Sequence, residues 1–202
     1  MALNFANNNS LSAITSLPAS ISGGALTLLQ TQTASSSASI SFTSNIDSTY
    51  DAYMFKFYDI HPATDSVDFV FNLSADSGSN YNITKTSTYF RAWHSEAGDD
   101  TNLRYETGSD LAQGTGFQSL TNSDLGNGND ECCVGTLHLF NPSSTTFVKH
   151  FIATTNTYHS ADYTFNSFIA GYGNTTSAID AVQFKMDSGN IDSGVIKLYG
   201  VS

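Results

Sequence analysis

In the stretch Ser66-Val-Asp-Phe-Val-Phe-Asn-Leu73, apolar side chains alternate with mostly polar ones. The apolar side of this stretch is made by Val67, Phe69, Phe71 and Leu73. Asp68 and Asn72 occupy the opposite side. Successive side chains of a β-strand point to opposite faces of its sheet, so a period of two predicts a strand that is buried on one face.

The residues on either side of this stretch extend the pattern. Upstream, 53–58 alternates the aromatic residues Tyr53, Phe55 and Phe57 with more amphipathic ones, which predicts a second strand. His61-Pro62 predicts a turn between the two strands, because proline has no N–H to donate to a sheet. Downstream, 76–80 reads Asp-Ser-Gly-Ser-Asn, residues that tolerate the left-handed backbone of a second turn.

Similar alternation recurs from Ala25 to the C-terminus, without a helical period of useful length or a strong internal repeat. Further strands are expected around 26–28, 40–42, 89–93, 103–105, 117–120, 134–140, 147–153, 163–170, 182–186 and 195–199. About ten short strands with turn signals every roughly 8–14 residues are typical of an antiparallel sandwich. We therefore predict an all-β fold, an antiparallel β-sandwich of jelly-roll type, over residues 25–202.

Residues 1–24 form a separate region with little periodicity. Apolar side chains are scattered through it, at Leu3, Phe5, Leu11, Ile14, Leu17 and Ile21. A free tail has no need of such anchors, so one interpretation is an extended arm that becomes ordered by docking and anchors the chain in an assembly. The other interpretation is a short helix over 11–17 that packs on its own domain.

Charge and composition exclude several functions. The net charge is -11 with seven Lys and Arg residues, which argues against binding to nucleic acid or to an anionic membrane. No stretch is long and apolar enough to span a bilayer, and residues 1–22 lack the basic start and apolar core of a signal peptide. Charged residues are only 12% of the chain, and short uncharged polar side chains replace them. Such a surface loses little side-chain entropy on burial and therefore suits an assembly contact.

The cysteines and histidines give no metal or cofactor motif. Cys132 and Cys133 are adjacent, so a bond between them would be strained, and we expect two free thiols at the start of a strand, made in a reducing cytoplasm. The five histidines lack paired ligand spacing. Residues 124–131 resemble a calcium loop, with Asp124, Asp130 and Glu131 as candidate ligands. Glycines stand at its third and fifth positions, however, which favours a flexible acidic loop.

The sequence contains no recognisable catalytic motif, and its aspartates mostly fall in turn contexts, so we predict a protein that is not an enzyme. The one cluster suited to a ligand is Tyr89-Phe-Arg-Ala-Trp-His94. In it, Tyr89 and Trp93 could stack on a sugar or a partner side chain, while Arg91 and His94 supply hydrogen bonds. The alternative is that Trp93 is a core residue.

Two segments resemble a known class of proteins. The first, 45–53 (Asn-Ile-Asp-Ser-Thr-Tyr-Asp-Ala-Tyr), leads into the aromatic strand, the proline turn and the loop 74–81. The second, 179–200, contains Ser188-Gly-Asn-Ile191, Ser193-Gly194 and a closing Leu198-Tyr-Gly200. Together they resemble structural proteins of tailed bacteriophages, especially marine ones, found in tail appendages or on the capsid exterior.

This resemblance implies a virion component that is assembled in the host cytoplasm and exposed on the particle. Its partners would be other virion proteins and copies of itself, and fibre and spike proteins of this kind are commonly trimers. No heptad repeats are present, which favours a compact knob, adaptor or decoration protein over a long shaft. The alternative function is a carbohydrate-binding module that recognises a host surface glycan.

Overall fold

The computed structural model describes residues 25–122 and 125–202, and within them every regular element is a β-strand. All strand pairs are antiparallel. The predicted all-β, antiparallel fold is thereby confirmed for these residues. The predicted arm, with Leu3, Phe5, Leu11, Ile14 and Leu17, lies outside the described residues, as does the alternative helix over 11–17.

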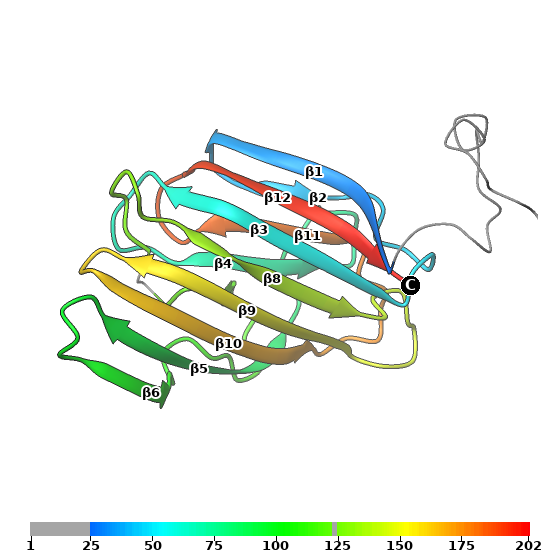
Figure 1. The fold of residues 1–202 in the computed structure, drawn as a ribbon. Helices are drawn as coiled ribbons and strands as arrows, with labels where there is room; N and C mark the ends of the chain where they lie inside the picture. The colour runs from blue at the N-terminus through cyan, green and yellow to red at the C-terminus, as the bar shows by residue number, and fades with distance from the viewer. Residues whose placement is uncertain (1–24, 123–124) are drawn as a thin grey trace, which may run out of the picture.

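The strands form two sheets (Figure 1). In spatial order, the larger sheet contains β1 (Leu26–Ser37), β12 (Ile191–Val201), β3 (Ala52–Pro62), β8 (Cys133–Phe140), β9 (Lys149–His159), β10 (Tyr163–Gly173), β5 (Lys85–Ser95) and β6 (Thr101–Tyr105). The smaller sheet contains β2 (Ile40–Phe42), β11 (Ala181–Met186), β4 (Phe69–Ser74) and β7 (Gln118–Ser119). Aromatic side chains of the two sheets meet between them, which gives a sandwich-like arrangement.

Phe184 of β11 lies at the centre of this aromatic core. Its ring centroid is 5.2–6.3 Å from those of five other phenylalanines, drawn from both sheets: Phe42, Phe55, Phe57, Phe69 and Phe71. All six side chains are almost completely buried. Aromatic rings bury large apolar areas and gain further energy from edge-to-face packing, so this cluster contributes much of the cohesion between the sheets.

The stretch 66–73 is more buried than its alternation predicts. Every residue of β4 is buried, including Val70 and Asn72 on the side expected to be exposed. The Asn72 amide donates to the carbonyl oxygens of Tyr81 and Thr115, at 2.7 and 3.0 Å. Residues distant in sequence thus cover the second face of β4, and the prediction of a half-exposed strand is wrong there.

The strands are also longer than expected. The larger sheet contains five strands of 11 residues and one of 12. Thr, Ser and Asn fill many of the additional positions, such as 154–157 in β9, and these residues give no apolar alternation. His61-Pro62 closes β3 instead of forming a turn: Pro62 is the last residue of the strand and faces Ile191 of β12.

The larger sheet extends beyond the smaller one on the side of β10, β5 and β6. There, residues 106–122 lie over its inward face. Among their contacts, the hydroxyl of Thr155 donates to the carbonyl of Leu120 at 2.6 Å, and the amide of Gln118 accepts from Ser87 at 2.5 Å.

At one end of the sandwich, β1 begins beside the last residue of the chain, since the Ser202 N–H donates to Ala25 (3.3 Å; Figure 1). The β5–β6 and β9–β10 turns lie at the opposite end.

Candidate functional surface

The predicted cluster 89–94 lies on β5, where strand alternation divides it between two faces. Tyr89, Arg91 and Trp93 point inward, whereas His94 is exposed on the outward side. Tyr89 is fully buried, and its hydroxyl donates to Ser167 at 2.7 Å. Trp93 is half-buried, and its indole N–H donates to Asp100 at 3.0 Å. The four side chains therefore do not converge on one ligand, and Tyr89 faces no solvent.

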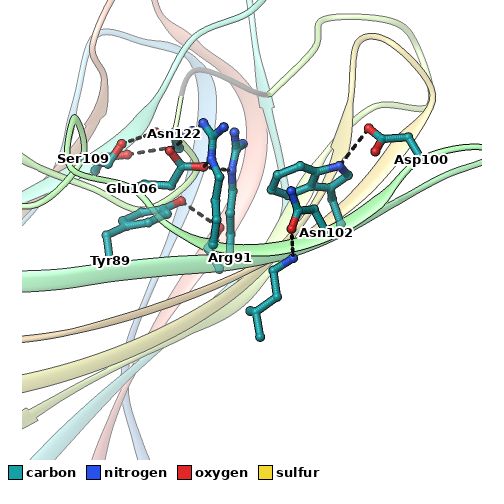
Figure 2. A network of polar contacts seen from close by, with 12 residues as sticks. Tyr89, Arg91, Asp100, Asn102, Glu106, Ser109 and Asn122 are labelled. Atoms are coloured by element: carbon teal, nitrogen blue, oxygen red, sulfur yellow. Dashed lines mark hydrogen bonds and ion pairs between the residues drawn. The ribbon is translucent and has the colours of Figure 1, made fainter.

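Arg91 belongs to a polar network on the inward face of the larger sheet (Figure 2). Its Nε lies 2.7 Å from Glu106, and Arg104 reaches the same carboxylate from β6 at 2.6 and 2.9 Å. The amide of Asn122, turned with its oxygen toward Arg91, accepts from both terminal guanidinium nitrogens at 3.0 and 3.1 Å. The Arg91 guanidinium also lies 4.4 Å from the Phe165 ring.

This network has a structural role. Burial raises the pKa of Glu106, but hydrogen bonds and charge from Arg104 and Arg91 outweigh it and hold that pKa below its usual range. A buried carboxylate needs such partners to remain charged. Because Glu106 and Asn122 stand at the two ends of the covering segment, the network fixes 106–122 against β5 and occupies Arg91, one of the predicted ligand residues.

Two other buried groups have strongly shifted pKa values. The ammonium of Lys85 donates to the side-chain oxygen of Asn72 and to the carbonyl of Ile83, and burial lowers its pKa to about 7. Burial and the nearby charge of Asp187 raise the pKa of Asp68 to about 7. Asp68 lies close enough to Tyr89 and Arg91 to interact with them electrostatically, and both groups bear on stability.

The outward face of the larger sheet is unusually apolar. We define this outward face as the side chains of β3, β5, β6, β8, β9, β10 and β12 that point away from the smaller sheet. Ten large apolar side chains are exposed among the described residues, and seven lie on it: Tyr58, Phe90, Leu103, Tyr105, Val134, Phe140 and Ile152. Exposed apolar side chains gathered on one face in this way mark a candidate interaction surface.

Charge is distributed unevenly with respect to this face. No Asp or Glu occurs in the strand segments 52–58, 85–95, 101–105, 133–140, 149–159, 163–173 and 193–201. Of the 18 acidic residues of the chain, only Asp59 and Asp192 lie on the seven complete strands, where β3 ends and β12 begins. Lys56 and Lys197 supply the positive charge of the outward face, and each ammonium lies over a tyrosine ring, Tyr199 at 5.6 Å and Tyr58 at 5.3 Å respectively.

An aromatic pair and a shallow hollow lie on the part of the outward face formed by β5, β10 and β9. Phe90 of β5 stacks on Phe168 of β10, with ring centroids 5.0 Å apart and an interplanar angle of 12°. Beside this pair is a hollow of about 200 Å³, whose lining includes Phe90, Phe168, Ile152 and Ala170. Leu103, on the edge strand β6, is 64% exposed and stands as an apolar projection on the same face.

A second, more polar hollow lies beside His94 at the end that holds the β5–β6 and β9–β10 turns. Its volume is about 390 Å³, and its lining includes His94, Glu96, Asn156, Tyr158 and Tyr163. A smaller hollow, about 210 Å³, shares His94 and includes Trp93. Two of the predicted residues thus border these hollows. Tyr158 and Tyr163 were missed, although both flank the turn 159–162, whose composition alone gave no signal for binding.

The candidate calcium loop is folded around its own carboxylate. Glu131 accepts the Gly128 N–H, while Asp130 borders a hollow of about 400 Å³ with Asp59 and Asp192. Asp124 lies outside the described residues. Within 25–122 and 125–202, no group of three or more His, Cys, Asp or Glu side chains is arranged to hold a metal ion.

The two cysteines are free thiols, and Cys133 is the first residue of β8, as predicted. Cys133 is fully buried, and burial raises its pKa to about 12. A thiol that stays protonated is a poor nucleophile and a poor metal ligand. Cys133 therefore acts as a small apolar core residue.

The described part of the chain has no helix with the length and apolar character that crossing a bilayer requires. Comparison of the chain with protein-family models, curated proteins and solved structures gives no match.

Proposed function

We propose that this chain is a non-enzymatic structural component on the surface of a tailed-bacteriophage virion, in a tail appendage or as an adaptor or capsid decoration. The observation that carries the proposal is the order of strands in the two sheets. It supports a jelly roll, the fold that many viral capsid domains share.

A jelly roll has eight strands in two Greek keys. Numbered in chain order, its sheets read 1-8-3-6 and 2-7-4-5. Setting aside the hairpins β5–β6 and β9–β10 leaves β1-β12-β3-β8 in the larger sheet and β2-β11-β4-β7 in the smaller. Renumbered from one to eight, these strands give the same two orders. The two hairpins are then insertions that widen one sheet.

Surface chemistry agrees with an assembly role. The outward face offers apolar side chains, and its seven strands contain only two carboxylates, Asp59 and Asp192, which suits a protein–protein contact. The phage-like segments 45–53 and 179–200 suggest the kind of assembly, with the virion as location and the host cytoplasm as the place of assembly. In this proposal residues 1–24 anchor the sandwich to neighbouring virion proteins.

The test is to purify intact particles of the phage that encodes the chain and to identify their proteins by mass spectrometry. Chymotrypsin is the suitable protease, because the chain has 24 Phe and Tyr residues but only seven Lys and Arg. We expect the chain in a fixed ratio to the major capsid or tail protein. Its confinement to the soluble lysate, with none in gradient-purified particles, would contradict the proposal.

A second candidate function, carbohydrate binding, is favoured by the polar hollow beside His94. Tyrosine rings can pack on the C–H faces of a sugar, while amide and carboxylate groups accept and donate hydrogen bonds to its hydroxyls. Tyr158, Tyr163, Asn156 and Glu96 supply these groups. Lectin domains also use jelly rolls, so the strand order is compatible with both functions.

Carbohydrate binding predicts a specific glycan signal that depends on this hollow. On a glycan array we expect Tyr158→Ala to weaken binding by roughly 10- to 100-fold, the usual range for losing one aromatic anchor. Phe147→Ala is the matched control, since Phe147 is an exposed aromatic residue that does not line the hollow. Absence of binding, or equal loss in both variants, would remove this candidate.

A further inference from the structure

We infer that the outward face of the larger sheet is the interface between two copies of this chain, packed face to face about a twofold axis. This inference deepens the proposed function, because it names the partner of that surface, and it rests on an assembly role for the chain.

Charge selects the partner. A basic partner would find only Asp59 and Asp192, where β3 ends and β12 begins, and an anionic one would find only Lys56 and Lys197. A fitting partner surface must therefore be apolar and nearly uncharged. The chain's own outward face has that character. Two chains of net charge -11 can also approach through this face with few opposing carboxylates, because only Asp59 and Asp192 lie on its strands.

The area is sufficient for a stable dimer. Neighbouring strands lie about 4.8 Å apart and rise about 3.4 Å per residue, so the strands from β12 to β6 present a surface of roughly 800 Å². A standard protein–protein interface buries about 800 Å² per partner. Two sheets packed face to face are also a common arrangement in β proteins, with a spacing of about 10 Å.

The relief of the face fits a twofold contact. In such an interface the same surface serves both copies, so a projection on one copy meets a recess on the other, and the reverse. Leu103 is the projection, and the recess is the apolar hollow bordered by Phe90, Phe168 and Ile152. They lie on the same face, with Leu103 on β6 and the hollow between β5, β10 and β9.

The experiment measures the mass of the full chain in solution by light scattering after size exclusion and by sedimentation over a concentration series. We expect a dimer. Leu103→Glu and Ile152→Glu place a charge in the apolar contact and should each raise the dissociation constant at least about 100-fold. Both positions are exposed, so the variants should fold, which their unchanged melting temperatures would confirm.

Phe147→Glu is the matched control, because Phe147 is 69% exposed but lies between β8 and β9, off the outward face. It should associate like the unmodified chain. A chain that is monomeric at every concentration, or a trimer, would overturn the inference. So would Leu103→Glu and Ile152→Glu variants that still associate fully. A dimer that is absent from particles would refute the virion role alone, and a monomer present in particles would refute the dimer alone.

Discussion

Replacing Phe184 with alanine should lower the free energy of unfolding by about 3–5 kcal/mol, the usual cost of removing a buried aromatic ring. The ring contacts five phenylalanines from both sheets and is completely buried. Its loss leaves a cavity that the strands on either side cannot close, because each is fixed by its own sheet hydrogen bonds. Denaturant-induced unfolding, followed by fluorescence and circular dichroism, measures the change.

Phe147→Ala removes the same ring from an exposed position and should change stability by less than about 0.5 kcal/mol. Phe184→Leu retains most of the volume and should fall between the two, which gives a measurable variant if Phe184→Ala does not fold. A loss below about 1 kcal/mol for Phe184→Ala would show that the two sheets do not depend on this aromatic cluster.

Stability should pass through a minimum near pH 7, on account of Asp68 and Lys85. Asp68 has a folded-state pKa of about 7, so between about pH 4 and 7 the folded chain holds a proton that the unfolded chain has lost. Stability from this group therefore falls as the pH rises through that range, by on the order of 4 kcal/mol.

Lys85 has a folded-state pKa of about 7 and regains an ordinary value near 10.4 on unfolding. Above pH 7 the unfolded chain binds more protons, so stability rises with pH, by on the order of 2 kcal/mol up to pH 8.5.

Two variants separate these contributions. Asp68→Asn should flatten the change below pH 7, and Lys85→Met should flatten the change above it. Burial lowers the pKa values of His138 and His159, and this opposes part of the fall in stability below pH 7. The informative quantity is therefore the difference in stability between each variant and the unmodified chain. Measurements stop at pH 8.5 because the raised pKa of Cys133 begins to act in the opposite direction above it. Parallel pH profiles for all three proteins would contradict the prediction.

The sequence predicted the strands well wherever large apolar residues alternate with polar ones. The segments 53–58 and 182–186 lie in β3 and β11, because their apolar positions face the core. Strand ends built from Thr, Ser and Asn were missed, since pairing with neighbouring strands holds them in place and no local apolar pattern marks them. This accounts for the difference between the predicted short strands and the observed long ones.

The candidate site was harder to predict, because it depends on which side of each strand faces the core. In β5, both sides carry aromatic residues: Tyr89 is buried, while Phe90 is 41% exposed. Local sequence cannot distinguish these two sides. The covering segment 106–122, remote in sequence, buries Arg91 and leaves Phe90 and His94 outside. The outward face is also built from strands that are spread over residues 52–201, so no single sequence motif predicts it.

The position of the hairpin β5–β6 in the larger sheet makes it depend on the hairpin β9–β10. This hairpin joins the sheet only through the pairing of β5 with β10, and β10 joins only through β9. A strand cannot be added to a sheet before the neighbour that supplies its hydrogen bonds. Removal of β9–β10 would therefore leave β5–β6 without its neighbour in the sheet, whereas removal of β5–β6 would leave β9–β10 paired with β8.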